Sequence, residues 1–256
     1  MIGLGLNTAA DTSHPALFQE AFANTKAVRT NGVDQIITFL DDSSSPLKVI
    51  DNRGTGTLAF WFKAKSYSND LYIYNRVSGS DYFRILYTAS TDQVAIVGAV
   101  GGSTFSIFNV YNTASNFLTA QTWHHFALVL NKSGNWSCTL YIDGNAKLPI
   151  ATMVGTASIA PGTVADRMGA SVTVAAYSII SVDEIACWDG VALSAAAITE
   201  LQSHYNLAQD SGNYTNSGEL VRWYRLEDST AEETGNGGAA RLINSPVFTT
   251  DTPFTV

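Results

Sequence analysis

The sequence is short of charge, above all of basic side chains. Its 256 residues include 14 Lys and Arg against 22 Asp and Glu, and 14% of the chain is charged, where an average soluble domain has about 25%. Affinity for nucleic acid and for anionic membrane surfaces comes largely from basic residues. We therefore expect neither a nucleic acid nor a membrane among the partners of this protein.

Long hydrophobic runs and an export signal are also missing. The most apolar stretches, residues 94–102 and 170–180, are far shorter than the ~20 residues that a membrane helix needs. Residues 1–6 carry no basic side chain, and Asn7 and Thr8 follow before an apolar segment of signal length can form. The sequence therefore predicts a chain without a membrane span and without a cleavable export signal.

Cysteine is scarce as well. The two residues, Cys138 and Cys187, are too few for a disulfide-based scaffold, and each lies in an apolar, strand-like run. This setting favours a pair of buried thiols. A single disulfide between neighbouring strands is the other interpretation.

What the chain does contain is apolar and aromatic material arranged in short alternating segments. Hydrophobic residues make up 46% and aromatic residues 11% of the sequence, which excludes intrinsic disorder. Leu58, Phe60 and Phe62 fall on one face of a strand, as a half-buried strand requires. Gly, Asn, Asp and Ser separate many such segments, which predicts an all-β, antiparallel β-sandwich. The segments are 57–63, 71–74, 82–88, 93–100, 105–110, 123–130, 137–142, 172–177, 182–188 and 220–226.

One short helix is expected near the C-terminal end. Ser194 is placed to cap a helix over residues 195–205, and Leu193 and Ile198 have the spacing of a hydrophobic staple. No charge block or low-complexity linker divides the chain. We expect one domain over residues 1–256, consisting of an N-terminal arm (1–23), a sandwich core (24–190), and the helix with a C-terminal strand extension (191–256).

Three segments, taken in order, resemble the laminin-G-like branch of the concanavalin A-like jelly rolls. The first is residues 28–37, with an Asn31-Gly32 turn. The second and most specific joins Trp123-His124 to the later run Leu140-Tyr141-Ile142-Asp143-Gly144. The third is residues 182–188 followed by 193–198. The resemblance spans about residues 24–206 and implies a jelly-roll sandwich.

The C-terminal tail suggests a biological setting. Residues 220–228, with Gly235-Asn236-Gly237 after them, resemble the segment that often begins such a domain. Residues 219–248 either supply a strand that the N-terminus would otherwise supply, or start a truncated second repeat. Similar tails occur in laminin-G-like domains of bacteriophage virion proteins. The resemblance therefore implies a non-enzymatic structural protein on the outer surface of a virion (capsid decoration, head fibre or tail component), in contact with other virion proteins and with copies of itself.

The sequence contains few residues that would indicate an enzyme. Glucanases of this fold carry an E-x-D-x-x-E strand, which is missing here, and no G-x-S-x-G motif occurs. Asp183 and Glu184 are adjacent, so a regular strand would point them to opposite faces. The same argument separates His124 from His125, which we expect at core or rim positions. A glycoside hydrolase is the least favoured function.

Asp183 is the one candidate metal ligand. On a regular strand it shares a face with Ile185 and Cys187, which should point inward, and a buried carboxylate needs a partner. The resemblance implies that an Asp at this position can help to bind a structural calcium ion, with backbone carbonyls as further ligands. A carboxylate that accepts backbone N–H bonds is the alternative.

Aromatic side chains provide a binding hypothesis. Tyr72 and Tyr74 should share the face opposite Leu71 and Ile73. Exposed aromatics on a sheet stack on sugar rings or anchor protein interfaces, whereas an ordinary second core face is the plain alternative. A carbohydrate-binding lectin is thus the second candidate function. The candidate glycan or protein contacts are Tyr72, Tyr74, Tyr82, Trp136 and Tyr141.

Overall fold

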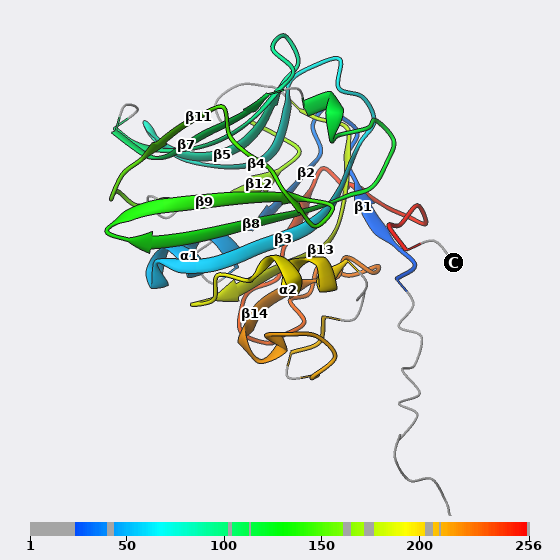
Figure 1. The fold of residues 1–256 in the computed structure, drawn as a ribbon. Helices are drawn as coiled ribbons and strands as arrows, with labels where there is room; N and C mark the ends of the chain where they lie inside the picture. The colour runs from blue at the N-terminus through cyan, green and yellow to red at the C-terminus, as the bar shows by residue number, and fades with distance from the viewer. Residues whose placement is uncertain are drawn as a thin grey trace, which may run out of the picture.

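The protein folds as two antiparallel sheets packed face to face, with a helix and part of the C-terminal segment on the outer side of one of them (Figure 1). A computed structural model describes residues 24–39, 44–101, 104–112, 114–160, 165–171, 177–202, 207–209 and 211–254. The N-terminal arm expected over residues 1–23, and most of the strand expected over 172–177, lie outside these residues. The described part confirms the all-β, antiparallel sandwich.

Within the part of the chain that the structure describes, each sheet has eight strands. Sheet A contains, in spatial order, β10 (Asn145–Ala146), β9 (Asn135–Ile142), β8 (His124–Ser133), β3 (Thr55–Ala64), β13 (Ile180–Asp189), β1 (Ala27–Arg29) and β16 (Val247–Thr249), with β14 (Leu220–Tyr224) also paired to β13. Sheet B contains β11 (Ala151–Val154), β7 (Thr104–Asn112), β6 (Gln93–Val100), β5 (Asp81–Thr88), β4 (Leu71–Ser78), β12 (Asp166–Met168), β2 (Ile36–Phe39) and β15 (Arg241–Ile243). The segment 28–37 therefore contributes to two strands, β1 and β2, in different sheets.

The main core lies between the two sheets. Leu58, Phe60 and Phe62 of β3 are all buried on its inner face, as the alternation predicts. The ring of Phe126 on β8 lies 5.4 Å from the rings of both phenylalanines. Cys187 is buried here too, Cys138 is partly buried, and both are free thiols, so the disulfide interpretation is wrong.

A second, smaller core covers part of the outer face of sheet A. Ala127, Ala59 and Ala186 are in register across β8, β3 and β13. Because alanine has no bulk beyond Cβ, α2 (Ala195–Leu201) can lie close over this row, and its residues Ile198 and Leu201 are buried there. The other buried members of the cluster are Trp188, Leu193, Ala197, Leu207, Tyr214, Leu220 and Trp223.

The predicted helix is confirmed at its start. Ser194 Oγ accepts a hydrogen bond from the N–H of Ala197 at 3.2 Å, and Leu193 and Ile198 are both buried. The helix ends at Leu201, and residues 203–206 lie outside the described residues. None of the helices in the described part is long and apolar enough to cross a membrane.

A second helix, α1 (Pro46–Arg53), which the sequence analysis did not predict, precedes β3. Its sequence signals are a capping serine, a proline in the first turn and a glycine after the last turn. In the structure, Ser45 Oγ accepts a hydrogen bond from the N–H of Lys48, and Gly54 ends the helix with a φ of 73°. The helix places Leu47 and Ile50 in the main core. Two short 3₁₀ turns, η1 (Ala114–Asn116) and η2 (Ser217–Glu219), are the remaining helical segments described.

The C-terminal extension is part of both sheets. β14 pairs with β13, β15 pairs with β2, and β16 pairs with β1. Residues 219–248 are thus attached to the sandwich, as the first form of the tail hypothesis requires.

Candidate functional site

Two of the five candidate aromatic contacts are buried, which corrects the expectation that they face solvent. Tyr74 is fully buried because a bulge interrupts β4: Tyr72 pairs with Leu86 and Tyr74 with Ile85, so Ile73 is an extra residue that turns Tyr74 inward. Trp136 is buried as well, and its indole N–H donates to the carbonyl of Ala157 at 2.7 Å.

Tyr74 belongs to a buried polar network that the sequence analysis missed. Its hydroxyl donates to Asp166 Oδ2 at 2.5 Å, and Ser45 Oγ donates to the same atom at 2.5 Å. Arg76 Nη1 binds Asp166 Oδ1 at 2.7 Å, and both residues of this ion pair are fully buried. The strand pattern around Arg76 carries no sign of a carboxylate 90 residues away. The network has a structural role.

Tyr72 and Tyr82 remain partly exposed on the outer face of sheet B. Tyr72 pairs with Leu86 and Tyr82 with Val77, so the two tyrosines are separated along β5 by four residues, or roughly 13 Å at the usual rise per residue. The guanidinium of Arg84 lies 4.4 Å from the ring of Tyr82. Tyr141 is elsewhere: it pairs with Ala127 on the outer face of sheet A and packs against the second core.

The same face of sheet B ends in an exposed apolar edge. Val97, Phe108 and Met153 are in register across β6, β7 and β11, the last strand of the sheet. All four residues of β11 are exposed, and residues 148–154 contain no charge. We call Leu148, Ile150, Met153 and Val154 the apolar edge; their exposed fractions are 88%, 62%, 51% and 47%.

Asp183 does not point inward with Ile185 and Cys187, because β13 contains a bulge. Asp183 pairs with Trp61 and Ala186 with Ala59, so two residues of β13 face one of β3, and Glu184 has a φ of 49°. The bulge places Asp183 on the outer face of sheet A. It also brings the Asp183 and Glu184 carboxylates together: Asn24 Nδ2 donates to both, at 2.9 Å each. The prediction that these two carboxylates diverge was therefore wrong.

Both carboxylates are buried, and no cationic side chain among the described residues forms a hydrogen bond with either of them. Burial raises the pKa of Glu184 to about 8, although the indole N–H of Trp223 donates to it. Burial and the neighbouring Glu184 raise the pKa of Asp183 well above its usual range. N–H groups occupy both Asp183 oxygens, since Oδ1 accepts from the Glu184 backbone at 3.0 Å. This arrangement does not fit a calcium ion, and the described residues contain no cluster of three His, Cys, Asp or Glu suited to a metal.

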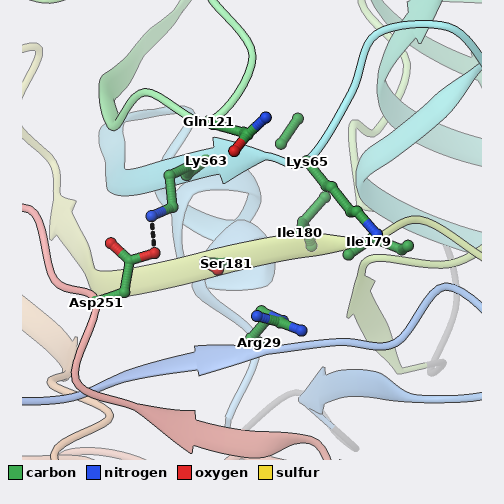
Figure 2. Close-up of a pocket in the computed structure, with 9 residues that line it drawn as sticks. Arg29, Lys63, Lys65, Gln121, Ile179, Ile180, Ser181 and Asp251 are labelled. Atoms are coloured by element: carbon green, nitrogen blue, oxygen red, sulfur yellow. Dashed lines mark hydrogen bonds and ion pairs between the residues drawn. The ribbon is translucent and has the colours of Figure 1, made fainter.

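A hollow of about 400 Å³ lies further along the outer face of sheet A (Figure 2). Arg29, Ser181 and Lys63 are in register across β1, β13 and β3. Lys63 forms an ion pair with Asp251, which also accepts a hydrogen bond from Trp123 Nε1 at 3.2 Å. We call this hollow the basic pocket; its lining residues are Arg29, Lys63, Ala64, Lys65, Gln121, Ile179, Ile180, Ser181 and Asp251.

The two sheets, their pairing and the helix after the closing strand define a lectin-like jelly-roll sandwich. The family model for the concanavalin A-like lectin/glucanases superfamily, Laminin_G_3, matches residues 37–199. The chain belongs to this family. No curated protein matches the chain.

Solved structures with a similar fold are distant in sequence. The CBM40 module of the Ruminococcus gnavus IT-sialidase, bound to α2,3-sialyllactose, is 14% identical, with 69% of this chain and 95% of that chain covered and a TM-score of 0.46. The heptameric SAP-like pentraxin from Limulus polyphemus is 14% identical, with 73% and 85% covered and a TM-score of 0.45. The receptor-binding domain of botulinum neurotoxin C/D is 12% identical, with 74% and 48% covered and a TM-score of 0.46.

Proposed function

We propose that the protein is a non-enzymatic structural component of a bacteriophage virion, on the outer surface of the capsid or tail, and that its sandwich makes protein contacts there. The apolar edge is the observation that carries this proposal. Edge strands of soluble proteins are protected by charges, proline or bulges, since their free backbone groups pair readily with another strand. β11 itself contains no charge, proline or bulge, although it is short and Pro149 lies two residues before it, and it exposes Met153 and Val154.

The occupant that fits this edge best is a second copy of the chain. Two β11 strands related by a twofold axis would pair antiparallel and join two copies of sheet B. The row of Val97, Phe108 and Met153 would then continue across the junction as a shared apolar face. Such self-association suits a protein present in many copies on a symmetric particle.

The carboxylates favour a binding role over hydrolysis. Asp183 and Glu184 are exposed by only 0% and 3%, and N–H donors occupy the oxygens of Asp183. A glycosidase needs an acid and a second carboxylate that both reach the substrate. This buried pair supports a module without hydrolytic activity.

Two measurements test the proposal. Light scattering of the purified protein reports its oligomeric state, and mass spectrometry and imaging of purified virus particles from the same source report whether they contain the chain. We expect a concentration-dependent dimer or higher oligomer, lost in Met153→Lys and retained in Val247→Lys. Val247 is a matched control because it is 52% exposed on β16, at the other sheet's edge. A monomer at all concentrations, or particles that lack the chain, would contradict the proposal.

Carbohydrate binding is the second candidate function. Tyr72 and Tyr82 support it, because two partly exposed rings on one sheet face can each stack on a sugar. Screening the protein against an array of oligosaccharides tests this role. Tyr82→Ala should abolish binding, whereas Tyr141→Ala, on the other sheet, should leave it unchanged; the reverse pattern would exclude this face.

A further inference from the structure

The last described segment of the chain consists of β16 and the residues after it. We call residues 247–254 the C-terminal arm. We propose that neighbouring copies of the chain exchange this arm, so that the arm of one copy lies beside β1 of the next. The inference rests on the proposed self-association and adds a second contact to it, because β16 is at the edge of sheet A and the apolar edge belongs to sheet B.

The C-terminal arm completes sheet A. β16 pairs antiparallel with β1, with Val247 opposite Arg29 and Thr249 opposite Ala27, and it is the last strand of this sheet in the described part of the chain (Figure 1). Without the arm, β1 would present unpaired backbone N–H and C=O groups, and such an edge readily takes up a strand from another chain. An arm from either copy makes the same backbone hydrogen bonds there.

Side chains after β16 fix the arm at a defined position. Asp251 forms an ion pair with Lys63 of β3 and accepts a hydrogen bond from Trp123 Nε1 at 3.2 Å. The ring of Phe254 lies edge to face with that of Trp61, at 5.1 Å between ring centres. The site beside β1 therefore recognises the arm by charge, hydrogen bonding and aromatic contact together, and a second copy supplies the same three kinds of contact.

The arm is attached to the sandwich mainly from outside. Phe248 packs against the main core but is only partly buried. Thr252 is buried, and its hydroxyl donates to the carbonyl of Asn24 at 3.3 Å. A terminal segment with few buried apolar contacts opens at a low cost in free energy. We therefore expect the arm to detach while the sandwich stays folded.

The hinge before the arm favours its release. Asn244 and Ser245 follow β15 of sheet B and lead through Pro246 to β16 of sheet A, and both have a left-handed φ of 57°. Residues other than glycine rarely adopt this φ, and a residue before proline prefers an extended backbone. Opening of the arm lets Ser245 become extended, which relieves the strain of the closed form. Short, strained hinges of this kind promote the exchange of segments between copies.

Exchange requires copies that are held close together. In an isolated copy, the arm's own site has a high effective concentration, which keeps the arm closed on its own chain. When the hinge is extended, the chain from Ile243 to Val247 spans at most about 14 Å. An exchanged arm therefore brings two copies into direct contact. Closely spaced copies on a particle, as in the proposed function, meet this requirement.

Disulfide trapping between two single-substitution variants tests the exchange. One chain carries Arg29→Cys and the other Val247→Cys, at exposed positions that face each other across β1 and β16. Directly opposed residues lie about 4.5–5.5 Å apart between Cα atoms, within reach of a disulfide. This disulfide joins two chains when the arm of one lies beside β1 of the other. Both chains also carry Met153→Lys, so the apolar edge does not contribute.

The two folded variants are mixed at high concentration, diluted and oxidised, and the linked heterodimer is measured by mass spectrometry. We expect several-fold more heterodimer than from the mismatched pair of Arg29→Cys and Thr250→Cys. Thr250 is also exposed on the arm, but it lies three residues, or roughly 10 Å, further along. The mismatched pair therefore reports random collisions of exposed thiols, including those of the two native cysteines.

Hinge variants provide a second measurement. Ser245→Gly removes the strain of the closed form and should lower the heterodimer yield several-fold, whereas Ser245→Val, whose branched side chain fits a positive φ poorly, should raise it. Asn216→Gly is the control, because Asn216 also has a left-handed φ, of 65°, but lies outside the arm and its hinge.

Two results would overturn the proposal. A matched pair that links no better than the mismatched pair would show that the arm stays on its own chain. Equal yields in the two Ser245 variants would show that the hinge does not control exchange. Circular dichroism verifies that each variant is folded. Light scattering of the parent protein and of Met153→Lys alone reports separately on the apolar edge, so failure of one contact is distinguishable from failure of the other.

Discussion

Asp143 Oδ2 lies 2.7 Å from Nδ1 of His124, so the two halves of the most specific family motif in this chain are bonded to each other. The N–H of Thr119 donates to the other ring nitrogen of His124 at 2.8 Å, which places the imidazole proton on Nδ1. Asp143 Oδ1 accepts the backbone N–H of His125 at 2.8 Å. One carboxylate thus ties the β9–β10 turn to the start of β8.

Breaking this connection should destabilise the sandwich. In Asp143→Asn, the amide N–H that replaces Oδ2 faces the Nδ1–H of His124. If the ring proton moves to Nε2, it faces the backbone N–H of Thr119 instead. Two donors therefore oppose each other in either tautomer. We expect a loss of about 1–3 kcal/mol in the free energy of unfolding, the usual cost of an unsatisfied, partly buried polar group. Urea unfolding measures it. Asn145→Ala, which removes an exposed bond in the same turn, is the control, and an equal loss in both variants would contradict the role of His124.

The buried pair of Asp183 and Glu184 should make stability fall as the pH rises. A free Glu carboxyl titrates near 4.5, but burial raises the pKa of Glu184 to about 8. Between these values the folded protein binds more protons than the unfolded chain, so the free energy of unfolding decreases with increasing pH. The favourable contribution of the protonated form is therefore complete at low pH and is lost by about pH 8.

Glu184→Gln tests this prediction, because the amide removes the titration and keeps an oxygen to accept the Trp223 indole bond. The melting temperature of the variant should exceed that of the parent at pH 8, and the difference should shrink towards pH 5. Glu233→Gln, an exposed residue, is the control and should leave the pH profile unchanged. A parent protein that becomes more stable from pH 5 to pH 8, by an amount unaffected in Glu184→Gln, would refute the assignment.

The Arg76–Asp166 pair should be the most sensitive point of the main core. Asp166→Ala leaves the fully buried Arg76 guanidinium without its counter-ion, which costs about 3–5 kcal/mol. Tyr74→Phe keeps the ring and removes a single hydrogen bond to Asp166, at a cost of about 1 kcal/mol. Chemical denaturation of both variants provides the comparison. A smaller loss of unfolding free energy in Asp166→Ala than in Tyr74→Phe would contradict the prediction that the buried ion pair stabilises the main core.

Periodicity predicted the sandwich because alternation along each strand is a local property. The faces of Leu58, Phe60 and Phe62 were predicted correctly for this reason. The predictions failed where one extra residue breaks the alternation. The bulge at Ile73 turns Tyr74 inward, and the bulge at Glu184 moves Asp183 to the outer face. Neither position carries glycine or proline as a warning.

The basic pocket could not be predicted from the sequence for a different reason. Arg29, Lys63 and Ser181 are neighbours only because β1 and β3 pair with opposite edges of β13. Each residue by itself is an ordinary polar position on a strand. Strand order, which determines the site, depends on pairings between residues more than 100 positions apart in the chain.

The row of alanines beneath α2 should limit how the second core can be changed. Ala59 is buried between Ala127 and Ala186, directly in the layer that α2 covers. Ala59→Leu adds volume that only a shift of α2 can accommodate, at a cost of about 1–3 kcal/mol. Ala196→Leu introduces the same side chain on the exposed side of α2 and should cost little. Thermal unfolding and amide hydrogen exchange within residues 195–201 distinguish the two. Faster exchange in Ala59→Leu alone would establish that close approach of the helix depends on the alanine row, whereas equal behaviour of the variants would contradict it.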